Sequence, residues 1–206
     1  MRNTCFIRTT RLFGWTESCL KWTRMPWCFS VRSLPSTLPY DLLWAIYCVL
    51  HEAGAWLYYD VNFRKNHIVD LPEVASNIEE NMNLANLVRG SMEDFDYMYG
   101  LQDGDAIYER VSCHCQTLIL TDGPRSIRVY SPDGCETYPV QTIETVSTVG
   151  AGDNFNAGYI YAMLQGMDDQ ASRIEMAQRW SQDVCRQIGN NISDELVATI
   201  KKLELA

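Results

Sequence analysis

The chain has 206 residues, a formal net charge of −9 and a sequence pI near 4.8. This length suits one domain with a three-layer α/β core. The acidic balance argues against nucleic acid as a partner, because phosphate contacts need clustered Lys and Arg. The nearest candidate for a membrane span, Leu42 to Leu50, is interrupted by His51 and Glu52 and fits a buried helix better.

The cysteines predict a reducing compartment. All eight are scattered without the spacing of a disulfide framework, and the first twenty residues lack the continuous apolar core of a signal peptide. Reduced thiols and a cytoplasmic location are therefore expected.

Residues 1–45 are expected to be irregular. Up to residue 40, six basic residues stand against one acidic residue, and no helical or strand period persists. Two interpretations stay open: translation in a wrong reading frame, which we favour, and a genuine but unusual N-terminal extension. The regular part of the chain is assigned to residues 46–206.

After Asp41 the sequence alternates between helical and strand patterns. Helices are expected at 41–54, 72–85, 92–99, 152–166 and 170–188, and strands at 56–61, 87–90, 117–121, 126–130 and 136–140. Such alternation predicts a mostly parallel sheet with helices on both faces. Ligands of such sheets bind at the carboxyl ends of the strands.

The most informative segment is the glycine-rich turn within Thr148–Phe155. Gly150, Ala151 and Gly152 leave backbone N–H groups uncovered at the start of a helix, which favours anion binding. Asp153 follows directly, where a carboxylate repels a phosphate but can accept a proton from a hydroxyl. Phosphoryl transfer to a hydroxyl needs both features close together. A strand-to-helix turn with Asp as a helix cap is the alternative.

The pattern Thr-x-Gly-Ala-Gly-Asp-x-Phe at the start of a helix resembles the C-terminal signature of the ribokinase-like (PfkB) carbohydrate kinases. The resemblance implies a three-layer α/β/α ribokinase-like fold, with Asp153 as catalytic base and Gly150, Ala151 and Gly152 in the anion hole. It implies ATP-dependent phosphorylation of a sugar or sugar-acid hydroxyl, of the fructose or 2-keto-3-deoxygluconate type, with ATP and Mg²⁺. Ser147 replaces the Asp of many members in a region that holds a monovalent cation in some, so that cation stays open.

Two further segments resemble the family's phosphate and acceptor motifs. The segment Asp60-Val61-Asn62-Phe63-Arg64 resembles Asp-x-Asn-x-Arg, which implies nucleotide binding by Asn62 and substrate binding by Arg64. Ser91 and Asp94 occupy the ends of the family's Asn-x-x-Glu, which implies a nucleotide contact for Ser91 and metal support for Asp94. Each segment alone also fits an ordinary turn or helix cap.

The strand end Thr121-Asp122-Gly123 resembles the family's Thr-x-Gly at the nucleotide phosphates. The resemblance implies that Thr121 and Gly123 bind nucleotide, and an ordinary hairpin turn is the alternative. The loop Ile188–Asn191 resembles the glycine-containing loop that lines the family's adenine pocket.

The resemblance covers about residues 50–195, so the expected fold lacks the family's N-terminal part and its β lid. Two other functions stay open: a truncated fragment or pseudoenzyme that at most binds nucleotide, and a nucleoside kinase. The expected partner is a small sugar or sugar acid, with no nucleic acid and no membrane. A homodimer is a candidate assembly.

Overall fold

A six-stranded sheet runs through the part of the chain that the computed structural model describes, residues 28–32 and 40–204. Its strands lie side by side in chain order: β1 (Cys28–Arg32), β2 (Trp56–Asp60), β3 (Leu87–Ser91), β4 (Leu118–Asp122), β5 (Ser126–Ser131) and β6 (Gly134–Pro139). Strands β1 to β4 are parallel, whereas β5 and β6 join by antiparallel pairing. The mostly parallel sheet predicted from the sequence is confirmed.

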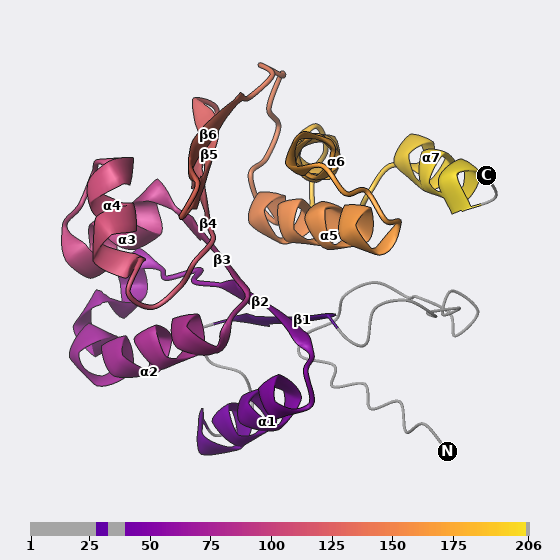
Figure 1. Cartoon of the computed structure of the whole chain (residues 1–206). Helices are drawn as coiled ribbons and strands as arrows, with labels where there is room; N and C mark the ends of the chain where they lie inside the picture. Colours follow the sequence, from indigo (N-terminus) through magenta and orange to yellow (C-terminus); the bar gives the residue numbers. More distant parts are fainter. Residues whose placement is uncertain (1–27, 33–39, 205–206) are drawn as a thin grey trace.

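Helices cover both faces of this sheet, which gives three layers (Figure 1). The helices are α1 (Tyr40–Glu52), the 3₁₀ helix η2 (Lys65–Asp70), α2 (Leu71–Leu84), α3 (Met92–Tyr99), α4 (Gly104–Val111), α5 (Ala151–Leu164), α6 (Gln170–Cys185) and α7 (Asp194–Glu204). Helices α1 to α4 lie on one face and α5 and α6 on the other, with α7 packed against α5 and α6.

The central strands are buried on both faces. Tyr58 and Tyr59 are neighbours in β2, point to opposite sides of the sheet, and are both fully buried. Tyr59 packs in the core with α2, α3 and α4, whereas Tyr58 packs in the core with α5 and α6. This two-sided burial explains why the parallel strands have nearly continuous apolar sequences.

The structure corrects the expectation that residues 1–45 are irregular. Strand β1 occupies Cys28–Arg32, pairs along its whole length with β2, and forms a parallel βαβ unit with α1, which begins at Tyr40. The sequence around β1 is rich in Trp, Cys and Arg and shows no alternation of apolar and polar residues, so periodicity did not predict this five-residue strand. The expectation for residues 1–27 and 33–39 lies outside the described residues. Helices η2, α4 and α7 were also not predicted.

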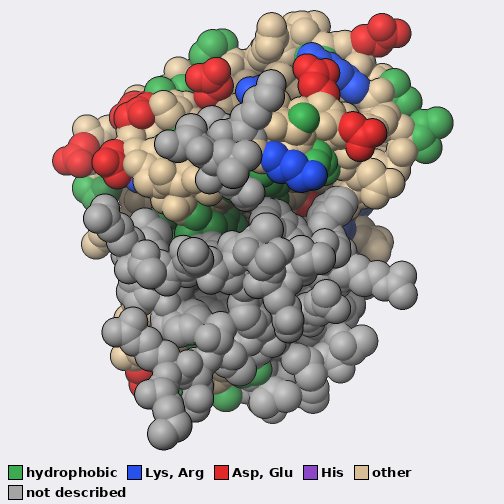
Figure 2. Space-filling model, turned by 90° about the vertical axis from the view of Figure 1, so that its right-hand side faces the viewer, with side chains coloured by type: hydrophobic (Ala, Val, Ile, Leu, Met, Phe, Trp, Pro, Cys, Tyr) green, Lys and Arg blue, Asp and Glu red, His purple; other side chains and the backbone are tan. Residues whose placement is uncertain are grey.

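None of the described helices is long and apolar enough to cross a membrane. On the face that Figure 2 shows, acidic side chains are spread over the described surface, with a few basic side chains between them. This distribution agrees with the acidic composition of the chain.

Gly158 sets the distance between α5 and α6. A Cβ atom at this position would lie 2.8 Å from the Met176 carbonyl oxygen and 2.9 Å from the Ala177 Cα atom, both in the backbone of α6. Gly158→Ala should therefore lower the free energy of unfolding by about 1–3 kcal/mol, through overpacking, in urea denaturation. An increase of about 1 kcal/mol, which helix propensity alone predicts, would contradict the close packing.

Candidate active site

The glycine turn, defined here as Gly150–Asp153, forms the N-terminus of α5. Gly150 is the N-cap residue, with a left-handed φ of 82°, and no side chain caps the helix there. Ala151, Gly152 and Asp153 form the first turn, and the Ala151 N–H donates to the Thr148 carbonyl at 3.2 Å, just before the helix. The N–H groups of a helix start and the positive end of the helix dipole favour an anion at this position.

A buried arginine of β3 lies against this turn. The Arg89 side chain is 10% exposed, and a Cβ atom at Gly152 would lie 3.2 Å from its Nη1 atom. Its guanidinium also lies over the Phe155 ring, 5.9 Å from the ring centre. A positive charge is thus packed against the first turn of α5.

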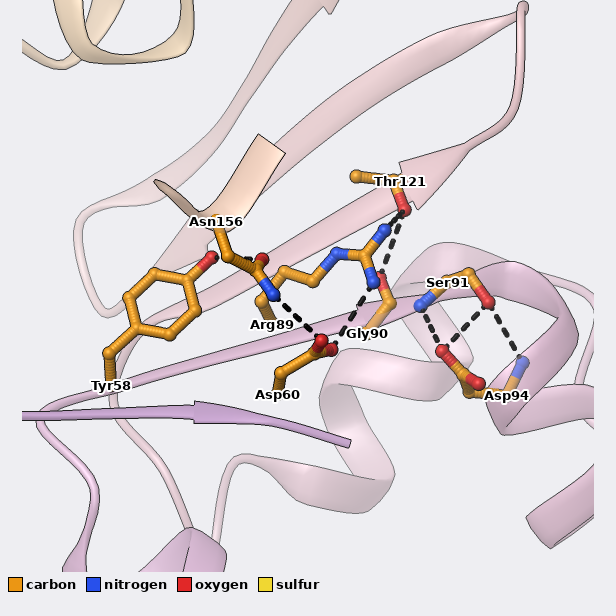
Figure 3. Close-up of polar contacts among 8 residues, drawn as sticks. All are labelled: Tyr58, Asp60, Arg89, Gly90, Ser91, Asp94, Thr121 and Asn156. Atoms are coloured by element: carbon orange, nitrogen blue, oxygen red, sulfur yellow. Dashed lines mark hydrogen bonds and ion pairs between the residues drawn. The ribbon is translucent and has the colours of Figure 1, made fainter. Parts of the chain in front are cut away.

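Arg89 is held by residues from the neighbouring strands (Figure 3). Its Nη1 donates to Asp60 Oδ1 at 3.2 Å and its Nη2 donates to Thr121 Oγ1 at 2.7 Å. Burial alone would lower the pKa of Arg89, but Asp60, Tyr58 and Asp94 raise it above its ordinary value, so the guanidinium stays charged. The pair satisfies two groups that would be costly to bury alone.

Asp60 also connects the sheet to α5. Its Oδ2 accepts a hydrogen bond of 2.7 Å from Nδ2 of Asn156, whose Oδ1 accepts one of 2.9 Å from the Tyr58 hydroxyl (Figure 3). Both Asp60 and Asn156 are at most 5% exposed. The helix that carries the glycine turn is therefore anchored to the carboxyl end of β2.

Ser91 and Asp94 form a capping box at the start of α3. Asp94 Oδ2 accepts hydrogen bonds from the Ser91 N–H at 2.6 Å and the Ser91 hydroxyl at 2.7 Å, while the Asp94 N–H donates to Ser91 Oγ at 3.1 Å. Burial raises the pKa of the Asp94 carboxyl, although Arg89 and Ser91 act in the opposite direction.

A pocket of about 590 Å³ lies beside this capping box. It brings together three residues predicted from the sequence, Arg64, Ser91 and Asp94, and its lining also includes Lys65, Glu93 and Tyr97. Arg64 is exposed and precedes η2 as its N-cap residue. The pocket therefore combines basic and acidic side chains at the carboxyl ends of β2 and β3.

The remaining predicted residues occupy strand ends and turns. Thr121 is next to Ser91 in the β3–β4 register, but its hydroxyl accepts from Arg89 and donates to the Gly90 carbonyl at 3.4 Å. Asn62 and Gly123 have left-handed φ values of 40° and 50° in the turns after β2 and β4. The predicted roles of these residues in binding stay predictions.

The capping box is suited to support a magnesium ion through water. Among the described residues, no group of three or more His, Cys, Asp or Glu side chains could hold a metal ion. Mg²⁺ commonly keeps several waters and takes one or two carboxylates together with substrate phosphates. Asp94 and Glu93 fit that limited role, because both line the pocket.

The pfkB family carbohydrate kinase profile matches residues 28–195, which include the whole sheet and the glycine turn. The chain belongs to this family. A fructokinase from Rhizobium leguminosarum bv. trifolii is 34% identical over 120 residues, which are 57% of this chain and 36% of the relative. The chain thus spans about a third of the length of the curated relatives it matches.

Solved structures support a ribokinase-like fold for this PfkB chain. Aminoimidazole riboside kinase from Salmonella enterica, complexed with aminoimidazole riboside and an ATP analogue, has a TM-score of 0.70 at 20% identity, covering 91% of this chain and 65% of that one. Fructokinase from Vibrio cholerae O395, in a form with fructose, ADP and calcium, has a TM-score of 0.69 at 21% identity and covers 79% and 56%.

Sequence reasoning on this PfkB chain missed Arg89 and Asn156, and assigned no role to Asp60. The available signal was polarity inside apolar segments: Arg89 interrupts the strand Leu87–Ser91, and Asn156 lies within the helix that follows the glycine turn. A charged or amide side chain in such a place needs a buried partner.

The Arg89–Asp60 pair gives a stability prediction. Arg89→Met should lower the free energy of unfolding by about 3–5 kcal/mol, because it leaves the Asp60 charge buried without its partner. The double variant Asp60→Asn/Arg89→Met should be more stable than Arg89→Met alone in urea denaturation. The control Arg125→Met breaks an exposed pair with Asp122 and should cost far less. Equal losses for the two arginines would contradict the buried pair.

Asp94 gives a prediction on pH dependence. The pKa of Asp94 is higher in the folded chain than its ordinary value of 3.8. Between these two pKa values, the folded chain therefore keeps a proton on Asp94 that the unfolded chain has lost. The wild type should therefore lose stability relative to Asp94→Asn across this window. Urea denaturation of both proteins at a series of pH values measures the difference, and a wild type that gains relative stability with pH would contradict it.

Proposed function

We propose that this chain carries the phosphoryl-transfer site of an ATP-dependent kinase that phosphorylates a hydroxyl of a sugar or sugar acid. Asp153 takes the proton from the attacking hydroxyl as general base. The N–H groups of the glycine turn hold charge on the transferred phosphoryl group. Ser91, Thr121, Gly123 and Asn62 are the proposed contacts to the nucleotide.

The observation that carries this proposal is the uncapped helix start with a carboxylate in its first turn. Gly150 caps α5 without a side chain, and Asp153 follows three residues later, in the first turn of the helix. Arg89 adds a fixed positive charge against Gly152, which favours negative charge at the turn. An anion site and a proton acceptor on one helical turn match the requirements of transfer to a hydroxyl.

The pocket beside the capping box supports an acceptor with an acidic or hydroxylated group. Arg64 can pair a carboxylate through two parallel hydrogen bonds, and Lys65 lies beside it in the lining. The similar proteins include a fructokinase and an aminoimidazole riboside kinase, so ketoses, sugar acids and ribosides are the acceptors to compare.

Magnesium would neutralise phosphate charge when bound, and Asp94 and Glu93 would support it through water. In this chain, Asp94 orients the start of α3 through its hydrogen bonds to Ser91. The pocket of about 590 Å³ beside it has room for phosphate and water. Glu93, in the same lining, adds a second carboxylate.

Asp153→Asn tests the role of the base. The variant should reduce transfer from ATP to the acceptor by about 10²–10⁴-fold, because the amide cannot accept the hydroxyl proton. Mg·ATP should still raise the melting temperature of the variant as it does that of the wild type. ADP formation with a panel of fructose, 2-keto-3-deoxygluconate and a riboside gives the rates, and Asp194→Asn, in the exposed first turn of α7, is the control.

Retained turnover in Asp153→Asn would contradict the base assignment. If the wild type is stabilised by Mg·ATP but transfers to no acceptor, the non-catalytic nucleotide-binding fragment is supported instead. Turnover with the riboside in place of the sugars supports a nucleoside kinase.

A further inference from the structure

Two asparagines that have no role in the proposed mechanism, Asn154 and Asn190, hold the glycine turn through hydrogen bonds and packing. Asn154, the fourth residue of α5 and 3% exposed, donates from Nδ2 to the Gly150 carbonyl at 2.9 Å and to Asn190 Oδ1 at 2.7 Å. Its backbone N–H donates to the same Gly150 carbonyl at 2.9 Å. Asn154 thereby joins the N-cap residue of α5 to Asn190, which lies 36 positions after Asn154 in the chain.

Asn190 also occupies the space beside Gly150. A Cβ atom at Gly150 would lie 2.0 Å from Asn190 Oδ1 and 2.4 Å from Asn190 Cγ. The left-handed φ of 82° favours glycine at position 150, and a Cβ atom there would displace the Asn190 amide. The contact limits the positions that the turn can take.

The segment that carries Asn190 is itself well held. We call residues 186–193 the Asn190 loop. Gln187 Nε2 donates to the Asn191 carbonyl at 2.8 Å across it, and the Ser193 N–H at its end donates to Asp183 Oδ2 at 2.7 Å. One hydrogen bond within the loop and one to α6 thus hold the segment that carries Asn190.

A second connection joins the start of the turn segment to the same place. The N–H groups of Val146 and Ser147 both donate to the Cys185 carbonyl, at 2.8 and 3.2 Å, where α6 ends. The chain entering the glycine turn and the turn itself are therefore both tied to the end of α6 and the loop that follows. Movement of the turn requires breaking contacts on both sides of Gly150.

We propose that Asn190 is a positioning residue that, through Asn154, holds the glycine turn in the conformation in which its N–H groups face a phosphate. The expected effect on catalysis rests on the proposed function. The effect of Asn190 on the conformation of the turn does not, because it concerns the protein without ligand. A preorganised turn costs no rearrangement when charge develops on the transferred group. A loosened turn should slow transfer more than it weakens ATP binding.

The first test measures backbone hydrogen exchange of residues 149–154 in the 206-residue chain without ligand. Asn190→Ala should raise exchange there about 3- to 10-fold, since it removes one hydrogen bond and the packing on Gly150. Asn191→Ala, the exposed neighbour, should exchange as the wild type does. Asn190→Asp keeps an acceptor for Asn154 and should also exchange at the wild-type rate.

Unchanged exchange in Asn190→Ala would overturn the inference, and so would an Asn190→Asp variant as fast as Asn190→Ala. Asn154→Ala provides an independent variant that removes the donor. If the two residues act as one unit, Asn190→Ala should raise exchange by a smaller factor in the Asn154→Ala background than in the wild type. Additive increases would show separate effects and contradict the proposed link.

The second test separates positioning from simple loop packing. Asn190→Ala should lower kcat about 10- to 100-fold while the KM for ATP changes much less. A raised KM with an unchanged kcat would indicate a nucleotide contact only and would overturn the positioning role. If the wild type itself shows no turnover, the proposed function fails, whereas the exchange experiment still decides whether Asn190 holds the turn.

Discussion

The candidate site depends on one buried charge, the guanidinium of Arg89. It stays charged inside the sheet because Asp60 and Thr121, from the strands on either side, lie within hydrogen-bond distance. Asp60 is the register partner of Arg89, and Thr121 lies two residues beyond the β4 residue that pairs with it, so all three share one face. A slip of one residue in either strand would turn a partner to the opposite face and leave a charge unpaired.

The same charge relates the sheet to the glycine turn. Arg89 packs against Gly152 and Phe155, while Asp60, its partner, accepts a hydrogen bond from Asn156. The first two turns of α5 are thereby fixed to the carboxyl ends of β2 and β3. Gly158 fixes the same helix to α6 on its far side, so α5 has little freedom to shift.

The sequence predicted the features that are local and missed those that depend on distant partners. The glycine turn, the capping box of Ser91 and Asp94, and most helices and strands could be predicted, because each is encoded within a few neighbouring residues. The bonds of Arg89 span 29 and 32 residues and that of Asn156 to Asp60 spans 96, so only the fold brings these partners together. Strand β1 is defined by its pairing with β2 in an aperiodic sequence, which periodicity cannot detect.

The contacts also explain why the turn has glycine at two positions and not merely one. Gly150 faces Asn190 from outside the helix, and Gly152 faces Arg89 on the side of the sheet, with hypothetical Cβ atoms at 2.0 Å and 3.2 Å from those side chains. A side chain at either position would push against the amide of Asn190 or the guanidinium of Arg89, so the two glycines let both groups pack closely on the turn. A turn held between a buried cation and an amide keeps its donors in place before any anion arrives. Such preorganisation is the property that electrostatic stabilisation of a transferred phosphoryl group demands.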